Sequence, residues 1–230
     1  MTRVAAARTD NTRPSEAIQN YAKAIYALEQ RGGGAVTNNA LAERMRVTPA
    51  SASSMVKKLD ELGLVRHVPY KGVKLTASGR RVALEVLRHH RLLELYLAES
   101  LGLPWDRVHD EAEVLEHVLS EELEARIAAK LGNPTRDPHG DPIPSAELEI
   151  EEGNTECLAA LEPGARGVFV RVSDSDPSML RYLAELGITP GERFEIVDRQ
   201  PFGGPLFARF NRRVHVLGGD LAAAMRVEVD

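Results

Sequence analysis

Residues 37–79 constrain the fold of this 230-residue chain more than any other segment. The stretch TNNALAERMRVTPASASSMVKKLDELG predicts a short helix, a tight turn and a second helix that ends at Gly63. Thr48 is placed to cap the second helix, and Pro49 occupies its first position, where a missing N–H is harmless. LVRHV and GVKLT then alternate as two short strands around a PYKG turn. Two helices followed by a hairpin predict a winged helix-turn-helix.

The second of these helices is predicted to enter the major groove of DNA. Its first turns carry small polar and methyl-bearing groups that can approach base edges, with basic residues around them for phosphates. Helix capping alone also explains a serine-rich start, but the ordered helices and the basic hairpin favour DNA binding. We expect DNA contacts from Arg44, Arg46, Thr48, Pro49, Ala50, Ser51, Ser53, Ser54, Lys57 and Lys58, and from Lys71 and Lys74 on the hairpin.

Charge is distributed unevenly along the chain, although the overall net charge is only −5. Residues 1–80 hold 13 Lys/Arg against 6 Asp/Glu, a net of +7, whereas residues 81–160 hold 7 against 18, a net of −11. A basic first third is typical of polyanion binding and an acidic middle third of cation binding. Uneven surface charge without function is the simpler alternative.

The remaining elements predict a multidomain, mainly α chain with a small β-barrel at its C-terminus. Residues 78–101 predict one long helix, and the run from Val108 to about Lys130 another, since neither contains an internal proline. Short strands with Gly/Pro turns begin near Leu158. We expect a disordered tail over 1–14, the winged helix-turn-helix over 15–78, a helical domain over 79–145, a linker over 146–160 and the β-domain over 161–230.

Several classes of protein are disfavoured by what the sequence lacks. Cys157 is the only cysteine, which excludes an internal disulfide and any thiolate-rich metal site. No apolar run approaches the length of a membrane span, and the polar N-terminus lacks a signal peptide's apolar core, so we expect a cytoplasmic protein with no membrane partner. A zinc hydrolase is the enzyme alternative, but there is no HExxH string and no Gly-rich phosphate loop. We therefore expect neither catalysis nor a small-molecule substrate.

Two consecutive predicted helices carry candidate metal ligands. Imidazoles and carboxylates without a thiolate suit Mn²⁺, Fe²⁺, Co²⁺, Ni²⁺ or Zn²⁺, and the abundance of oxygen favours Mn²⁺. A solvated helix face is the alternative for any single pair, but two clusters on adjacent helices after a DNA-binding module favour a metal site. The candidates are His90 and Glu94, spaced i and i+4 on the first helix, and His109, Glu113, Glu116 and His117, on one face of the second.

These residues lie in strings that resemble the diphtheria-toxin-repressor family of metal-dependent transcriptional repressors over nearly the whole chain. The strings are NYAKAIYALE, LAERMRVTPASASSMVKKLDELGLV, LTASG, RHHRLLE, VHDEAEVLEHVLSEELE and NPTRDPHGDPIP. The tail resembles the family's SH3-like domain in SMLRYLAELGITPGERFEIVDRQPFGG and LAAAMRVE. The resemblance implies a homodimer whose two recognition helices are set by metal to meet a palindromic operator in double-stranded DNA. Metal-uptake and homeostasis genes are the implied targets.

The resemblance also implies two neighbouring metal sites. One contains His90, Glu94 and His109 with a side chain from the SH3-like domain, which we match to Asp176, with Asp174 as reserve. The other contains Glu113, Glu116 and His117, joined by Asn20 from the N-terminal helix. An alternative version of the first site contains Glu94, Asp137, His139 and Asp176; the two versions share Glu94.

The type of metal follows from one departure within the family. Iron-sensing members have Cys at the position of Glu113, whereas manganese-sensing members have Glu, a harder ligand. Asn20 stands where manganese sensors often have Asp, and offers only an uncharged carbonyl oxygen. We expect Mn²⁺ as the effector, with Fe²⁺ as the alternative and Zn²⁺, Co²⁺, Ni²⁺ or Cd²⁺ as substitutes in vitro. A winged-helix regulator that answers to an organic ligand is the remaining alternative.

Overall fold

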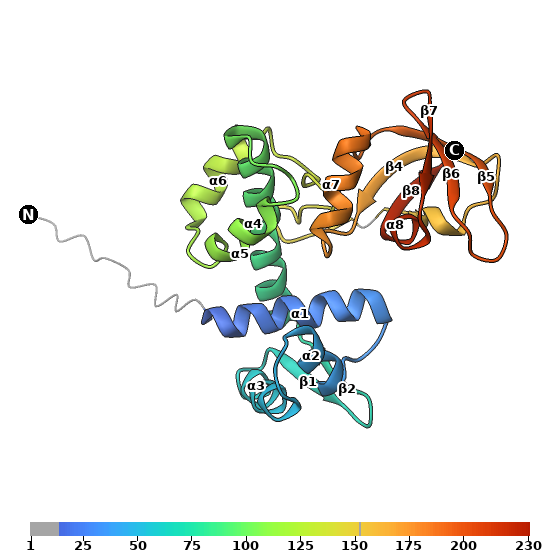
Figure 1. Cartoon of the computed structure of the whole chain (residues 1–230). Helices are drawn as coiled ribbons and strands as arrows, with labels where there is room; N and C mark the ends of the chain where they lie inside the picture. The colour runs from blue at the N-terminus through green and yellow to red at the C-terminus, as the bar shows by residue number, and fades with distance from the viewer. Residues whose placement is uncertain (1–13, 152) are drawn as a thin grey trace, which may run out of the picture. The chain divides into compact units, whose positions relative to one another are not determined.

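The computed structural model describes residues 14–151 and 153–230, which form two compact units, one up to Val86 and one from Leu87 to Asp230 (Figure 1). The tail expected over residues 1–14 lies outside the described residues except for Pro14. Within the described ranges, no helix is long and apolar enough to cross a membrane.

The N-terminal unit is a winged helix-turn-helix, which confirms that prediction. Its recognition helix buries Ala52, Val56 and Leu59 on one side, and its start is capped because the Thr48 side chain accepts a hydrogen bond from the backbone N–H of Ser51. The unit contains α1 (Glu16–Gly32), α2 (Asn38–Arg44), α3 (Pro49–Glu61), β1 (Val65–Val68), β2 (Gly72–Leu75) and the start of α4 (Ala77–Leu101).

The β1–β2 hairpin is anchored by a glycine at a close approach. Gly72 has a φ of 113°, and a Cβ atom there would lie 2.0 Å from the carbonyl oxygen of Val36. Val36 and Val73 exchange two backbone hydrogen bonds of 2.8 and 2.9 Å across this contact. The hairpin is therefore joined to the segment that leads into α2.

The helical part of the second unit differs from the sequence prediction at one point that affects the site. The single helix expected from Val108 to Lys130 is two helices, α5 (Val108–Leu115) and α6 (Glu121–Lys130). Ser120 starts the second one, since its side chain accepts a hydrogen bond from the backbone N–H of Leu123. No proline or glycine marks this break in the sequence. Consequently His117 lies in the intervening turn and not on the helix face predicted for it.

The C-terminal part is a six-stranded antiparallel sheet in the order β3-β8-β4-β5-β6-β7, which confirms the expected small SH3-like β-domain (Figure 1). Buried side chains such as Phe169, Leu183 and Phe210 form its core. Its elements are β3 (Glu156–Cys157), the 3-10 turn η1 (Leu158–Ala160), β4 (Arg166–Val172), α7 (Pro177–Leu186), β5 (Arg193–Arg199), β6 (Leu206–Phe210), β7 (Arg213–Leu217), α8 (Gly219–Ala224) and β8 (Met225–Val229).

Part of the segment expected to be a linker belongs to this sheet. Within residues 146–160, β3 pairs with β8, and the side chain of Leu158 is fully buried in the β-domain core. A two-residue strand and one helical turn are too short to give a periodic signal, which is why the sequence pattern does not reveal them. The sheet therefore begins at Glu156.

The irregular segment before the β-domain is packed tightly against β4. Gly140 has a φ of 89°, and a Cβ atom there would lie 1.8 Å from the carbonyl oxygen of Val170. The backbone N–H of Val172 donates to the carbonyl of His139 at 3.0 Å. These contacts fix the loop that carries Asp137 and His139.

Candidate metal centre

α4 provides two buried side chains one turn apart that organise the whole centre. His90 is 5% exposed and Glu94 is 1% exposed, and His90 Nε2 lies 3.0 Å from Glu94 Oε1. Ionisable groups this deeply buried are costly unless they are paired or bind a metal. Their partners therefore indicate what the centre can do.

The first group of ligand atoms contains His90, Glu94, His109 and Asp174, all within 4.8 Å of one another. His109, at the start of α5, places Nδ1 3.3 Å from Glu94 Oε1 and 3.0 Å from Asp174 Oδ2. Asp174 comes from the loop between β4 and α7, so this group joins two helices to the β-domain. Two imidazoles and two carboxylates form a nitrogen and oxygen donor set that fits a divalent transition metal.

Asp176, which the sequence analysis assigned to this group, is placed elsewhere, and its reserve Asp174 takes the position. Asp176 caps α7: its Oδ1 accepts hydrogen bonds from the backbone N–H of Ser178 at 2.8 Å and from the Ser178 hydroxyl at 2.6 Å. These bonds lower the pKa of the Asp176 carboxyl. Its carboxylate is therefore used at the helix start, which corrects the assignment.

The second group lies around Glu116, which is 1% exposed. Glu116 Oε2 lies 2.5 Å from His90 Nδ1, and Glu113 Oε1 lies 4.0 Å from the same nitrogen. His117 Nε2 lies 3.3 Å from the other carboxylate oxygen of Glu116. The structure therefore brings Glu113, Glu116 and His117 to one region, as the sequence analysis expected, and adds the far side of the His90 ring.

A third group contains Glu94, Asp137 and His139, which are all buried and within 4.8 Å of one another. His139 Nδ1 lies 3.8 Å from Glu94 Oε2, and His139 Nε2 lies 2.7 Å from the carbonyl oxygen of Trp105. Asp137 Oδ1 accepts from the backbone N–H groups of His139 and Asp141, each at 2.9 Å. The alternative version of the first site is thus also assembled, without Asp176.

Burial and close contacts shift the pKa values of three ionisable side chains in the centre. Burial alone would raise the pKa of Glu94, but the charge of His90 and hydrogen bonds from His109 and His90 outweigh it, and that pKa lies well below its usual range. Hydrogen bonds to Asp174 and then to Glu94 raise the pKa of His109 to about 10. Burial, followed by the negative charge of Glu94, raises the pKa of Asp137 well above its usual range.

The remaining sequence-predicted ligand, Asn20, lies on α1 in the N-terminal unit. Its side-chain oxygen Oδ1 is buried and has no hydrogen-bond partner among the described residues. A buried carbonyl oxygen without a hydrogen-bond donor can be satisfied by a bound cation or a water. Its membership of the second group stays a prediction.

All but one of the residues predicted to contact DNA are exposed to solvent in the N-terminal unit. Thr48 and Ser51 are engaged at the helix start, with their hydroxyl oxygens 2.9 Å apart, and Ser53 accepts a hydrogen bond from the Asn38 side chain. The exposed residues are Arg44, Arg46, Thr48, Pro49, Ala50, Ser51, Ser53, Ser54, Lys57, Lys58 and Lys71, whereas Lys74 is half-buried.

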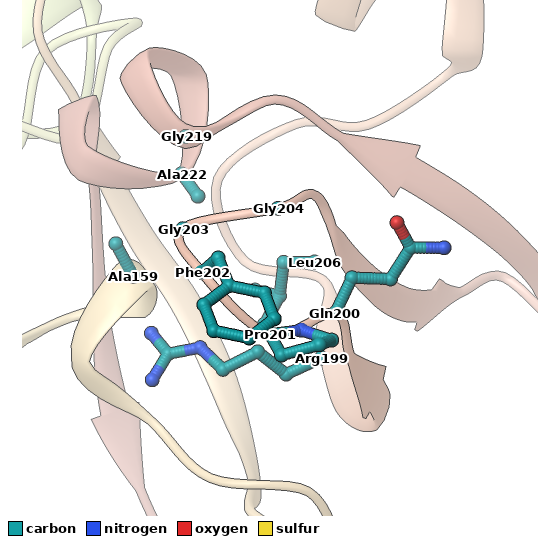
Figure 2. A pocket seen from close by; sticks show the side chains of 10 residues that line it. All are labelled: Ala159, Arg199, Gln200, Pro201, Phe202, Gly203, Gly204, Leu206, Gly219 and Ala222. Atoms are coloured by element: carbon teal, nitrogen blue, oxygen red, sulfur yellow. The ribbon is translucent and has the colours of Figure 1, made fainter.

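Sequence reasoning did not find Trp105 or the cavity of the β-domain. Trp105 stacks on His139, with ring centroids 5.9 Å apart, and donates its indole N–H to the carbonyl of Leu180 at 3.1 Å. Figure 2 shows a cavity beneath the β5–β6 loop, where Phe202 lies near Ala159 and Ala222. This cavity shares no residue with the three groups of ligands, so it is separate from the metal centre.

Family models cover most of the chain. Residues 14–73 match the iron dependent repressor N-terminal DNA binding domain, residues 76–145 match the iron dependent repressor metal binding and dimerisation domain, and residues 157–229 match the FeoA domain. The order of these three matches is that of the structural elements described above.

Curated relatives and solved structures agree with the family models. The iron-dependent repressor IdeR of Mycobacterium tuberculosis (strain H37Rv) is 32% identical over 225 residues, covering 93% of this chain and 97% of the relative. The diphtheria toxin repressor of Corynebacterium diphtheriae is 31% identical, with 93% and 97% covered. A manganese-dependent transcriptional repressor in complex with manganese is 44% identical, with a TM-score of 0.86 and 93% and 100% covered.

Proposed function

Because the chain belongs to the diphtheria-toxin-repressor family of metal-dependent transcriptional repressors, we propose that it is a cytoplasmic Mn²⁺ sensor that binds operator DNA as a homodimer. Members of this family are DNA-binding repressors and not enzymes. The observation that carries the proposal is the buried set of carboxylates and imidazoles around His90 and Glu94. When bound, the ion supplies positive charge to a region that holds an excess of buried acids.

The hydrogen bonds of His90 support a division of the proposed ligands into two main groups. His90 Nε2 faces Glu94 and His109, whereas its Nδ1 lies 2.5 Å from Glu116 Oε2. If Nε2 binds the metal of the first group, Nδ1 keeps its proton and donates it to the Glu116 carboxylate. A ligating histidine that donates its other N–H to a carboxylate is the usual arrangement.

The first site accordingly takes His90, Glu94, His109 and Asp174. The second takes Glu113, Glu116 and His117, with Asn20 as the predicted addition. Asp137 and His139 offer a further pair of ligands next to Glu94 Oε2. His139 donates its Nε2–H to the Trp105 carbonyl, which leaves Nδ1 available as a ligand.

Mn²⁺ is proposed over Fe²⁺ because the second group is rich in hard oxygen donors. Glu113 and Glu116 provide carboxylates, and the candidate groups found among the described residues contain no cysteine, a donor set that suits Mn²⁺. The 44% identical neighbour is a manganese-dependent repressor, whereas the 32% identical relative IdeR is an iron-dependent repressor. Fe²⁺ is therefore the second candidate.

A homodimer is supported by exposed apolar residues around the α5–α6 turn. Val114 is 71% exposed and Val118 is 75% exposed, and Leu115 and Leu123 are also exposed. Several large apolar side chains exposed at one turn are typical of a protein interface. Two copies related by a twofold axis would present two α3 helices to a palindromic operator.

Fluorescence anisotropy of a labelled DNA fragment from the chain's own upstream region tests the proposal. We expect tight binding with Mn²⁺, weaker binding with Zn²⁺, and loss of binding with a chelator, a coupling typically of about 1–3 kcal/mol. The same titration with Fe²⁺ under anaerobic conditions compares the second candidate metal with Mn²⁺. Equal DNA binding with and without every metal would refute the proposal and favour a regulator that answers to an organic ligand.

A further inference from the structure

We propose that His89 and Glu124 are positioning residues for the second metal site, because together they hold the backbone of the ligand Glu116. This inference rests on the proposed function. It concerns residues that are not themselves ligands and that lie outside the three groups described above. The geometry that points to it is a buried chain of contacts from α6 to the end of α5.

His89 lies next to His90 on α4 but faces other partners. Its Nδ1 lies 3.0 Å from the carbonyl oxygen of Glu116, and its Nε2 lies 3.0 Å from Glu124 Oε2 on α6. A carbonyl and a carboxylate can only accept hydrogen bonds, so both ring nitrogens of His89 donate. The ring therefore joins α6 directly to the backbone of a ligand residue.

The other oxygen of Glu124 is fixed by Arg88. Arg88 Nε donates to Glu124 Oε1 at 2.5 Å, and Arg88 Nη1 donates to the carbonyl of Pro144 at 2.6 Å. The Glu124 side chain is only 15% exposed and that of His89 only 3%. Both carboxylate oxygens of Glu124 are thus occupied in a largely dry environment, where charge-assisted hydrogen bonds are short and geometrically demanding.

The end of α5 explains why this backbone group needs a partner. The helix stops at Leu115, and Glu116 is its C-cap residue. Carbonyl groups at the C-terminal end of a helix have no intrahelical N–H donor and need another donor when they are buried. His89 supplies that donor, so Glu116 is held at its carbonyl by His89 and at its carboxylate by His90.

Stability alone gives little reason for this arrangement. A buried cluster of ions is often replaced by well-packed apolar residues with no loss of stability. Its geometric consequence is more specific, since it fixes where the first residue after α5 points its carboxylate. Groups that orient metal ligands typically change metal affinity about 10- to 100-fold when removed.

The test is a double-mutant cycle of His89→Phe with Glu116→Gln, read by electron paramagnetic resonance of free Mn²⁺ during titration of the full chain. The Glu116→Gln variant identifies the class of Mn²⁺ sites that contains Glu116. We expect His89→Phe to weaken that class about 10- to 100-fold and to leave the remaining class within about threefold. In the Glu116→Gln background we expect His89→Phe to have no further effect.

Two further variants keep the result independent of folding. Glu124→Gln keeps the size and an acceptor oxygen but removes the charge, and we expect a weaker loss in the same class of sites. Glu122→Gln, on the same helix and paired with exposed Arg126 at 2.8 Å, serves as the matched control and should change nothing. Metal-free melting temperatures are measured for all variants.

The outcomes separate this inference from the proposed function. Equal weakening of both classes of sites by His89→Phe, or an undiminished effect in the Glu116→Gln background, would overturn the positioning role and leave a structural one. An unchanged Mn²⁺ titration of His89→Phe would also overturn it. A wild-type chain that binds no Mn²⁺ would overturn the proposed function and this inference with it.

Discussion

Replacement of Asp174 by Asn, compared with the same change at Asp176, tests the first metal site most directly. Asp174 Oδ2 lies 3.0 Å from His109 Nδ1, whereas Asp176 caps α7. Asn is also a good N-cap, so Asp176→Asn keeps the cap while removing the same charge from a position two residues away. Comparing the two variants therefore shows whether metal binding depends on a carboxylate at position 174 or only on the total negative charge of this loop.

The size of the effect follows from the charge that Asp174→Asn removes. Two unit charges 4 Å apart interact by about 4 kcal/mol at an effective dielectric constant of about 20. The Asp174 side chain is 32% exposed, so solvent screening reduces this to about 2 kcal/mol, which is roughly 30-fold in affinity. We expect no measurable change in Mn²⁺ affinity for Asp176→Asn.

The loss of Mn²⁺ affinity in Asp174→Asn should depend on pH, because protons compete with the metal for His109. Hydrogen bonds to Asp174 and then Glu94 raise the pKa of His109 to about 10, so at pH 7 a proton must leave before this ring binds a metal. Wild-type affinity should therefore rise with pH, by up to about tenfold per pH unit between about 6.5 and 10. Without Asp174 the pKa of His109 falls, so the pH dependence flattens and the loss at pH 7 is reduced to about 10-fold.

The raised pKa of His109 also determines how the stability of the metal-free protein changes with pH. The folded-state pKa of His109 is raised, so its contribution to stability is fully present below about pH 6.5 and is lost as pH rises through about 10. Asp174→Asn should therefore destabilise the metal-free chain near neutral pH and matter less at high pH. Thermal melts with chelator at several pH values measure this.

Isothermal titration with Mn²⁺ at pH 6.5, 7.5 and 8.5 provides the assay for all three proteins. The reasoning is refuted if Asp176→Asn weakens binding as much as Asp174→Asn. It is also refuted if Asp174→Asn keeps the wild-type pH dependence, because His109 would then be insensitive to its nearest carboxylate.

Three further predictions test other parts of the molecule. Lys57→Ala should weaken DNA binding and lower the slope of log K against log salt by about 1, as measured by anisotropy, while Lys130→Ala on α6 leaves the slope unchanged. His117→Ala should abolish metal-dependent DNA binding and keep the wild-type circular dichroism spectrum; an unchanged metal response would remove His117 from the site. Gly140→Ala should destabilise the chain by at least about 2 kcal/mol in thermal melts, since its Cβ would lie 1.8 Å from the Val170 carbonyl oxygen; a neutral effect would contradict the close approach.

The winged helix-turn-helix was predictable because its signals are local. Thr48 caps α3 as expected from its place before Pro49, and α3 ends at Glu61, two residues before Gly63. Two short valine-containing runs, LVRHV and GVKLT, on either side of a PYKG turn marked both strands of the hairpin. Where capping, periodicity and turn residues all favour the same structure, a single sequence determines the elements well.

The metal centre was less predictable because tertiary contacts decide it. The break between α5 and α6 has no glycine or proline, and the buried carbonyl of Glu116 is satisfied by His89, which is 27 residues away. The choice between Asp174 and Asp176 depends on which carboxylate caps α7, and SDSDPS offers two aspartates before the same proline. Sequence spacing predicted the types of candidate ligand, and the packing of the β-domain against α5 decides which carboxylate reaches His109.

The shared residues of the centre limit how its sites can be filled. Glu94 presents Oε1 to His90 and His109 and Oε2 to His139, so its two oxygens can serve two groups at once. His90 differs, because a neutral ring has one nitrogen free to bind metal and one that keeps its proton. With Nδ1–H donated to Glu116, a metal bound to Nε2 would also orient a proposed ligand of the second site. Loss of the His90 ring should therefore weaken both sites, whereas loss of Asp174 should weaken only the first.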